Sequence, residues 1–419
     1  MSPSSLAHRH GPGTEAIEGR ADAGATHAHR PDASTDGEIV KRLALLPLLA
    51  LPVIATAPTA MATRAPAPLV HAPGGAASGQ YIVTVRSGSD NLRRAMGAVP
   101  GGTVTHVFTK VINGFSARLD AAQLDHLRHD PNVLKVAQAA TMHTMGTQSG
   151  AGWGLDRLDA VSGLDQSYTY NHTGKGVTAY VIDTGVDPSV PDFGGRAAVA
   201  FDATGGDGKD CNGHGTHVAG TIGGTKYGVA KDVTLRAVRV LDCQGSGTDA
   251  DVVAGMDWVA RHARKPAVVN MSIGGGKSVT IDAAAKKLSG AGTFLAVAAG
   301  NDGGDACSNS PAGAGGVLAV AASNKADASA AFTSHGRCVK VYAPGVDIIS
   351  DWLGGHPNTM SGTSMATPHV VGVAALYKEA NGDGSQAVVT GWITSHAVKG
   401  AITGVPAGTP NLLLNTGGL

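Results

Sequence analysis

Short apolar runs alternate with longer helix-type patterns over most of the chain. Predicted strands cover residues 177–182, 234–240, 268–273, 293–298, 317–322 and 339–342, and predicted helices cover residues 214–222, 248–264 and 364–380. Several strand segments consist almost entirely of Val, Ala, Leu and Ile, which is typical of strands that are covered on both faces. This alternation predicts an α/β fold with a doubly wound, mostly parallel sheet. In such sheets, chemistry collects beyond the carboxyl ends of the strands.

A different order of elements precedes this region. Predicted strands cover residues 81–85, 103–108, 114–119 and 133–136, and predicted helices cover residues 91–96 and 120–129. The order β-α-β-β-α-β predicts a small ferredoxin-like α+β domain over residues 80–145, ahead of a larger domain over residues 146–419. Residues 63–79 are rich in Ala, Pro and Gly, and we interpret them as a linker. Residues 137–150 are small and polar, and we expect them to be extended.

The N-terminal region has the pattern of an export signal. Residues 40–62 combine a basic start, an apolar run over residues 43–57 and a small-residue ending, which is typical of a secretory signal peptide. A membrane anchor is the alternative, but the run contains Pro47 and Pro52 and is shorter than the ~20 residues needed to span a bilayer. Residues 1–39 are polar and patternless, and form a disordered leader or a mis-assigned start. We therefore expect a secreted, extracellular protein with no membrane segment in its mature form.

Composition excludes several classes of partner. The chain has 419 residues, and its 32 basic residues balance 32 acidic residues, so no global field attracts nucleic acid or an anionic membrane. Aromatic residues make up only 4% of the chain, which leaves little material for stacking on bases. Glycine is frequent, with 60 residues, so we expect many tight turns and close backbone approaches.

Three glycine-flanked motifs present an aspartate, a histidine and a serine in that order. They are Asp183 within residues 181–185, His214 within residues 213–220 and Ser364 within residues 362–368. A serine nucleophile needs an imidazole to take its proton, and the imidazole needs a carboxylate to fix its tautomer. The motifs and their order resemble those of the subtilisin-like serine proteases, and are similar to the branch of proteinase K and aqualysin.

Neighbouring residues offer alternatives for two of these roles. His214 and His217 are three apart and form a potential metal pair, but no third ligand follows at the spacing of a zinc peptidase. The resemblance assigns the base to His214, which leaves His217 as a structural residue. Ser364 is preferred to Ser361 because it stands at the start of the predicted helix, where its amide N–H is free and the helix dipole favours negative charge. The resemblance also implies that Asn301 donates to the oxyanion.

The resemblance further implies how substrate binds and how the enzyme is controlled. An extended peptide would pair with two edge segments, and we expect broad specificity with an apolar P1 side chain. The substrate-binding residues expected are Gly245, Ser246, Gly247, Ser272, Ile273, Gly274, Ala299 and Gly300. Residues 80–145 look like an inhibitor I9-type propeptide, which would act as an intramolecular inhibitor and folding aid. Self-processing would then create a new terminus between Thr141 and Ser149, and we expect the mature enzyme to be a monomer.

Four cysteines lie downstream of the signal, where an oxidising compartment favours disulfides. Sequence alone allows three pairings, and it contains no clustered CxxC pairs of the kind that bind zinc. The resemblance favours Cys211 with Cys243 and Cys307 with Cys338.

Calcium is the point at which the resemblance weakens. The relatives bind stabilising calcium partly through an aspartate just before an Ala-Pro-Gly turn, where this chain has Lys340, and an ammonium group repels the ion. Asp202, Asp207 and Asp210 alternate with glycines and are weak calcium candidates, with plain turns as the alternative. No cofactor is required for the chemistry.

Together these features predict a secreted serine endopeptidase that matures from a proenzyme. A peptide ligase or transpeptidase uses the same acyl-enzyme but excludes water, so the products formed with an added amine would separate the two. A catalytically silent binding protein is disfavoured, because every triad and oxyanion position carries the residue that catalysis requires.

Overall fold

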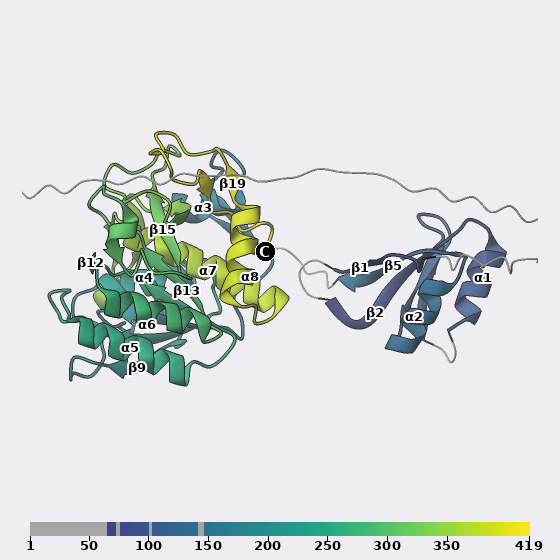
Figure 1. Ribbon diagram of the computed structural model, residues 1–419, viewed down its shortest axis with the longest axis horizontal. Helices are drawn as coiled ribbons and strands as arrows, with labels where there is room; N and C mark the ends of the chain where they lie inside the picture. The colour runs from purple at the N-terminus through teal and green to yellow at the C-terminus, as the bar shows by residue number, and fades with distance from the viewer. Residues whose placement is uncertain (1–64, 73–75, 100–102, 141–145) are drawn as a thin grey trace, which may run out of the picture. The chain divides into compact units, whose positions relative to one another are not determined.

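The computed structural model describes residues 65–72, 76–99, 103–140 and 146–419 of the chain (Figure 1). The leader predicted over residues 1–39 and the signal peptide predicted over residues 40–62 lie outside the described residues. Within the described ranges, no helix combines the length and the apolar character needed to cross a membrane.

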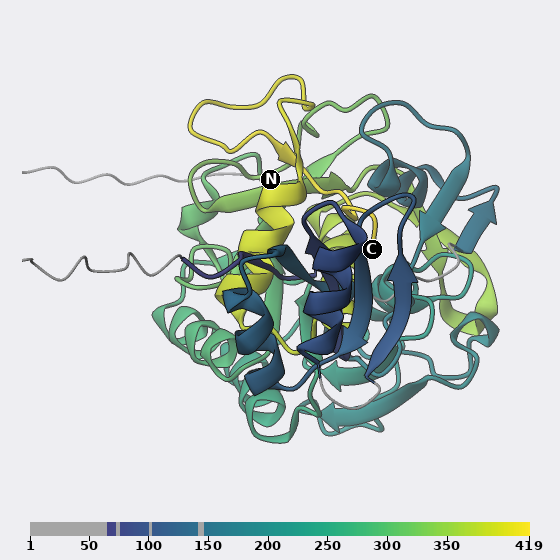
Figure 2. The same cartoon turned by 90° about the vertical axis from the view of Figure 1, so that its right-hand side faces the viewer.

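The N-terminal domain follows the predicted β-α-β-β-α-β order. After a short β1 (Leu69–Val70), its elements are β2 (Ala76–Val85), α1 (Ser89–Gly97), β3 (Val104–Phe108), β4 (Gly114–Arg118), α2 (Ala121–His129) and β5 (Val133–Ala140). The strands are arranged β1-β5-β2-β4-β3. Helices α1 and α2 lie side by side on one face of this sheet (Figure 2), where Leu92 and Leu127 pack with Val83 and Phe115. The polar start of α2 is fixed by a capping box between Asp120 and Gln123.

Part of the segment predicted as a linker forms strands. β1 pairs in parallel with β5, with Leu69 opposite Val136, and β2 begins at Ala76 rather than at Tyr81. The edge of β5 offers free backbone groups, and these bond to the incoming chain whatever its side chains are. The Ala-, Pro- and Gly-rich composition of residues 63–79 therefore gives no indication of this pairing.

The C-terminal domain is built on a nine-stranded sheet. In chain order its strands are β8 (Thr178–Asp183), β9 (Ala197–Asp202), β10 (Thr234–Arg239), β11 (Ala267–Met271), β13 (Phe294–Ala298), β15 (Leu318–Ser323), β16 (Val339–Pro344), β19 (Val398–Lys399) and β20 (Leu412–Leu413). The spatial order is β19-β20-β16-β15-β13-β11-β8-β10-β9. Within this sheet only β19 is antiparallel to its neighbour, which confirms the mostly parallel arrangement.

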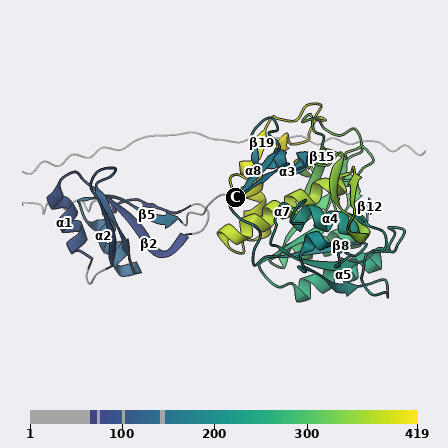
Figure 3. The ribbon, with the colours of Figure 1, turned by 180° about the vertical axis from the view of Figure 1, so that it is seen from behind.

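Helices cover both faces of this sheet, as the doubly wound prediction requires. They are α3 (Trp153–Asp159), α4 (His214–Gly223), α5 (Asp249–His262), α6 (Val279–Gly290), α7 (Thr363–Asn381) and α8 (Gln386–His396). Successive residues of β8 point to opposite faces: Val181 packs in the core that includes Val218 of α4 and Val370 of α7. Ile182 packs in the core that includes Met256 of α5. Helices α4 and α7 lie next to each other on the first face (Figure 3).

Several short pairings were not predicted from the sequence. β17 (Ile348–Asp351) and β18 (Pro357–Met360) form a hairpin, and β12 (Gly275–Gly276) pairs with β14 (Asn309–Ser310). The segment predicted as extended over residues 137–150 divides into two parts. Its first residues complete β5, and its last residues form β6 (Gly146–Ser149), which pairs with β7 (Ser167–Tyr170) in the C-terminal domain.

Candidate active site

Asp183 and His214 form the central ion pair of the site. Asp183 is the last residue of β8 and is fully buried, and His214 is the first residue of α4. Nδ1 of His214 donates to Oδ1 of Asp183 at 2.7 Å, and the backbone N–H of Thr184 donates to the same oxygen. Burial lowers the pKa of His214, but the Asp183 carboxylate more than offsets this effect, so the pKa of His214 is raised above 6.5. The arrangement fixes one ring nitrogen and leaves Nε2 available.

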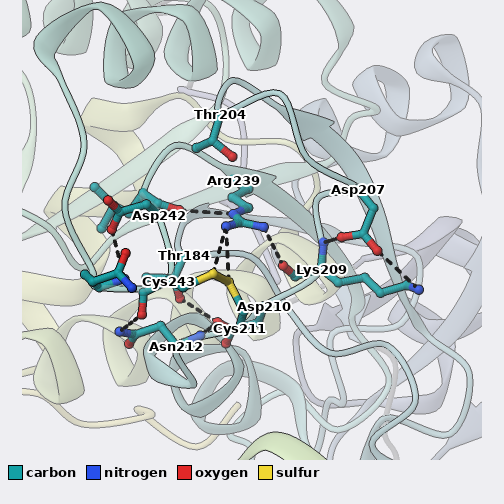
Figure 4. Close-up of a disulfide and its surroundings, with 12 residues drawn as sticks. Thr184, Thr204, Asp207, Lys209, Asp210, Cys211, Asn212, Arg239, Asp242 and Cys243 are labelled. Atoms are coloured by element: carbon teal, nitrogen blue, oxygen red, sulfur yellow. Dashed lines mark hydrogen bonds and ion pairs between the residues drawn. A yellow bond between two sulfur atoms is a disulfide. The ribbon is translucent and has the colours of Figure 1, made fainter.

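A buried carboxylate holds the start of α4 against the end of β8. Asp210 accepts hydrogen bonds from the hydroxyl of Thr184 and from the backbone N–H groups of Gly213 and Thr216, among others. Gly215 permits the close approach, because a Cβ there would lie 2.1 Å from the carbonyl oxygen of Gly185. Asp210 therefore satisfies helix N-terminal donors and keeps the imidazole beside its carboxylate. Figure 4 shows this segment beside the Cys211 disulfide.

Ser364 is the second residue of α7, close to the helix start that the sequence predicts. Its hydroxyl donates to the carbonyl oxygen of Ser272 at 2.9 Å, not to His214. In return the hydroxyl of Ser272 donates to the carbonyl oxygen of Ser364 at 2.7 Å. Residue 368 is proline and has no N–H to donate to that carbonyl, so Ser272 replaces the missing helical hydrogen bond. This exchange explains how Pro368 is accommodated inside α7.

Asn301 lies three residues beyond the end of β13. Its Oδ1 accepts hydrogen bonds from the backbone N–H of Thr363 at 2.8 Å and from the hydroxyl of Thr363 at 2.9 Å. Its Nδ2 and the backbone N of Ser364 lie 3.5 and 3.6 Å from the position that a Cβ on Gly362 would occupy. Two potential donors thus flank one point beside Ser364.

Three of the side chains described above line one cleft of about 580 Å³. His214, Ser364 and Asn301 lie on its walls together with six of the predicted substrate-binding residues: Gly245, Ser246, Gly247, Ser272, Ile273 and Gly274. Ala299 and Gly300 do not line it; Ala299 is buried in the core, and a Cβ on Gly300 would meet Asn309 and Ser334. Lining residues that sequence reasoning missed include Asn212, Leu241, Asp249, Val252, Ile281 and Met360. No motif marks these residues, because the packing of α5 and α6 brings several of them to the cleft.

His217 has a structural environment. Its Nε2 donates to the carbonyl oxygens of Ile348 at 3.0 Å and Asn358 at 3.2 Å, which ties α4 to the β17–β18 hairpin. Burial lowers the pKa of His217 to about 4. The ring is therefore neutral at physiological pH, and it belongs to no metal cluster among the described residues.

Two disulfides join the four cysteines. Cys211 bonds to Cys243 and Cys307 bonds to Cys338, as the resemblance implied. The guanidinium of Arg239 lies against the first bridge, 3.2 Å from Sγ of Cys211 (Figure 4). This bridge connects the segment that leads to His214 with the segment that leads to the Gly245 edge of the cleft.

The three aspartates proposed for calcium do not converge on one point. Asp202 accepts from the N–H groups of Thr204 and Gly208, and Asp207 accepts from the N–H of Lys209, to which it is also paired. Asp210 is occupied by the donors at the start of α4. No group of three or more His, Cys, Asp or Glu side chains is arranged to hold a metal in the described ranges. The Asp and Gly pattern here makes turns.

An Asp–His pair lies at the carboxyl end of a parallel strand, and its histidine lines the same cleft as a serine at a helix N-terminus; these are the side-chain types that a serine hydrolase uses. Comparisons with known proteins agree. A model of the subtilase family matches residues 174–412, and a model of peptidase inhibitor I9 matches residues 77–145. The chain is 42% identical over 402 residues to the extracellular serine proteinase of Thermus sp. (strain Rt41A), covering 89% of this chain and 98% of that protein.

Further relatives support the same assignment. The chain is 40% identical over 382 residues to proteinase R of Parengyodontium album, covering 88% of this chain and 97% of that protein. The crystal structure of a cold adapted subtilisin-like serine proteinase matches with a TM-score of 0.63 and 48% identity, covering 64% of this chain and 99% of that chain. The chain therefore belongs to the subtilase family, with an inhibitor I9 domain before its peptidase domain. It is a serine endopeptidase of the proteinase K and aqualysin type, and its catalysis needs no cofactor.

Proposed function

We propose that Asp183, His214 and Ser364 form the catalytic triad of a peptide-bond hydrolase. The observation that carries the proposal is the 2.7 Å bond from His214 to Asp183 at the edge of a cleft that Ser364 also lines. In the first step, Oγ of Ser364 attacks the scissile carbonyl carbon and its proton passes to Nε2 of His214. Asp183 stabilises the imidazolium, which then protonates the leaving amine. Water attacks the acyl-enzyme by the same path in reverse and releases the acid.

The oxyanion of the tetrahedral intermediate would accept hydrogen bonds from Nδ2 of Asn301 and the backbone N–H of Ser364. The bonds from Thr363 to Oδ1 of Asn301 support this role, because they orient the amide and leave its N–H groups free. Before attack, the hydroxyl of Ser364 must break its hydrogen bond to the carbonyl oxygen of Ser272 and donate to the imidazole of His214 instead. A rotation about its χ1 angle provides this exchange, and hydrogen bonds in unliganded sites are often rearranged in this way.

Substrates would bind as extended peptides between the Gly245–Gly247 edge and the Ser272–Gly274 edge of the cleft. Hydrogen bonds to the substrate main chain give affinity that depends little on the substrate's side chains, so specificity is broad. An apolar P1 side chain is preferred beside Ser364.

Maturation would proceed from a secreted proenzyme. In this proposal residues 1–39 are a leader or a mis-assigned start, residues 40–62 the signal, and residues 80–145 the inhibitory propeptide and folding aid. Residues 146–419 are then the mature, monomeric enzyme. The inhibitor I9 match and the extracellular relative support this order.

The test is a pair of serine variants. Ser364→Ala is expected to abolish both casein hydrolysis and self-processing, and an organophosphonate is expected to label Ser364 in the parent enzyme. Ser361→Ala is the matched control, because the Ser361 hydroxyl donates to Asp347 and does not line the cleft. Unimpaired maturation of Ser364→Ala would rule out the proposed nucleophile.

A further inference from the structure

One carboxylate that does not belong to the proposed triad lines the cleft. Among the lining residues in the described part of the chain, Asp249 is the one with a formal negative charge, and none is a lysine or arginine. Asp249 is the exposed first residue of α5, and its Oδ2 accepts a hydrogen bond from the hydroxyl of Ser278 at 2.6 Å. Ser278 is the N-cap of α6. The carboxylate is therefore held where the first turns of two helices meet.

Two apolar side chains line the same cleft as this carboxylate. Val252 follows Asp249 by three residues on α5, and Ile281 follows Ser278 by three residues on α6, so each lies on the same helix face as its partner. Both line the cleft and are only 9% and 5% exposed. The cleft therefore presents an apolar wall with a negative charge at its rim.

The surrounding charges leave this rim acidic. Asp251, in the first turn of α5, accepts a hydrogen bond from the backbone N–H of the N-cap Thr248, and Asp282 lies in the first turn of α6. Lys277 directly precedes the N-cap of α6, and its ammonium pairs with Asp282 at 2.7 Å and donates to the carbonyl oxygen of Cys307. No described cation neutralises Asp249 through an ion pair.

We propose that Asp249 makes this end of the cleft a subsite for a lysine or arginine side chain of the substrate, separate from the apolar P1 site beside Ser364. The inference rests on the proposed peptidase function. The methylene stem of such a side chain packs on Val252 and Ile281 while its charged head pairs with Asp249. An uncharged side chain of the same shape makes the apolar contact alone, so the contribution of the charge can be measured separately.

The experiment compares internally quenched peptides that carry arginine or its neutral analogue citrulline at each position on either side of an apolar P1 residue. At one position, the parent enzyme is expected to favour arginine by roughly three- to fivefold in kcat/KM, as for a partly exposed ion pair. This ratio is expected to fall towards one in Asp249→Asn and at high salt, and to persist in Asp249→Glu. Asp251→Asn is the matched control, because Asp251 is an acidic residue in the first turn of the same helix and does not line the cleft.

The possible outcomes distinguish a failure of the proposed function from a failure of the subsite assignment. If the parent enzyme hydrolyses none of the peptides, the proposed function fails. If it hydrolyses them with an arginine to citrulline ratio near one at every position, or if the preference survives in Asp249→Asn, the subsite assignment is overturned. Hydrolysis of the citrulline peptides by Asp249→Asn reports that this variant is folded.

Discussion

At the scale of single residues, the site depends on the orientation of one imidazole. Nδ1 of His214 is committed to Asp183, so the ring can exchange protons with substrate only through Nε2. The fully buried carboxylate also favours the charged ring, which raises the pKa of His214. The same contact thus fixes the tautomer and sets the pH at which the base becomes available.

The pH dependence of peptide hydrolysis is the first prediction at this scale. The base must be neutral, and its pKa is raised, so the acid limb of kcat/KM is expected to have its midpoint above 6.5, with activity highest at neutral to alkaline pH. Asp183→Asn is expected to lower kcat on the order of 10⁴-fold, because the ring loses its fixed tautomer. Both are measured with a peptide that does not titrate between pH 5 and 10. An optimum near pH 4 would contradict His214 as the base.

At the scale of elements, α4 begins at His214, and its last turn lies beside the buried carboxyl group of Asp351. Oδ2 of Asp351, on β17, would lie 2.7 and 2.8 Å from Cβ atoms placed on Gly220 and Gly224, so only glycine leaves room for it. Among the described residues this oxygen has no hydrogen-bond partner. Burial, followed by repulsion from Asp192, raises the pKa of Asp351 to about 8, and the positive charges of Lys226 and Arg196 only partly oppose the rise.

This carboxyl group makes the stability of the enzyme depend on pH. The folded-state pKa of about 8 is above the unfolded value of 3.8, so the contribution is fully present below pH 3.8 and is lost as pH rises through 8. Asp351→Asn is expected to gain stability over the parent between pH 5 and pH 9, by at least about 1.4 kcal/mol, the equivalent of one pKa unit. Thermal unfolding of inactive Ser364→Ala versions of both proteins measures the difference. The exposed Asp257→Asn serves as control, and a difference that is constant with pH would contradict the assignment.

Sequence patterns predicted the central elements of the fold because the central strands are buried on both faces. Continuous apolar runs mark β8, β11 and β13, and the periodic apolar positions mark α5 and α7. The elements that were missed are short or lie near the surface. β12 and β14 have two residues each, and β6 contains Gly146 to Ser149 with no apolar residue. Their pairing depends on backbone partners far away in the chain, which local patterns do not record.

The main residues of the candidate site were also predicted from the sequence. Asp183, His214, Ser364 and Asn301 stand in motifs whose glycines and flanking strands are visible in the sequence, and the structure places all four at or beside one cleft. The hydrogen bond from Ser364 to Ser272 was not predicted, because it joins residues 92 positions apart. The position of Asp249 was also not predicted, because it results from the meeting of two helices.

At the scale of the whole molecule, the start of the C-terminal domain indicates where maturation can occur. β6 begins at Gly146 and pairs with β7, and Gln148 within it is held from two directions. Its Nε2 donates to the carbonyl oxygen of Lys226 at 2.9 Å, and its Oε1 accepts from the ammonium of Lys231 at 2.5 Å. Cleavage after Gln148 would remove these contacts and leave the buried Lys231 with fewer acceptors.

We therefore predict that the mature enzyme begins no later than Gly146. N-terminal sequencing of the mature protein is expected to find a start between Thr141 and Gly146, within the range expected from the sequence. Cleavage directly before Gly146 would place Met145, an apolar residue, at P1. A mature terminus beyond Gly146 would contradict this prediction, and one beyond Ser149 would show that β6 is not part of the finished enzyme.

The bridge between Cys211 and Cys243 has a practical consequence. Both half-cystines are exposed, and their sequence separation is 32 residues. By closing a loop of this length, the bridge stabilises the fold by roughly 3.7 kcal/mol. It links the backbone just before His214 to the Gly245–Gly247 edge of the cleft. Thiol additives in a purification buffer would reduce this bridge and loosen both segments. Activity should therefore be measured in preparations that contain no thiol.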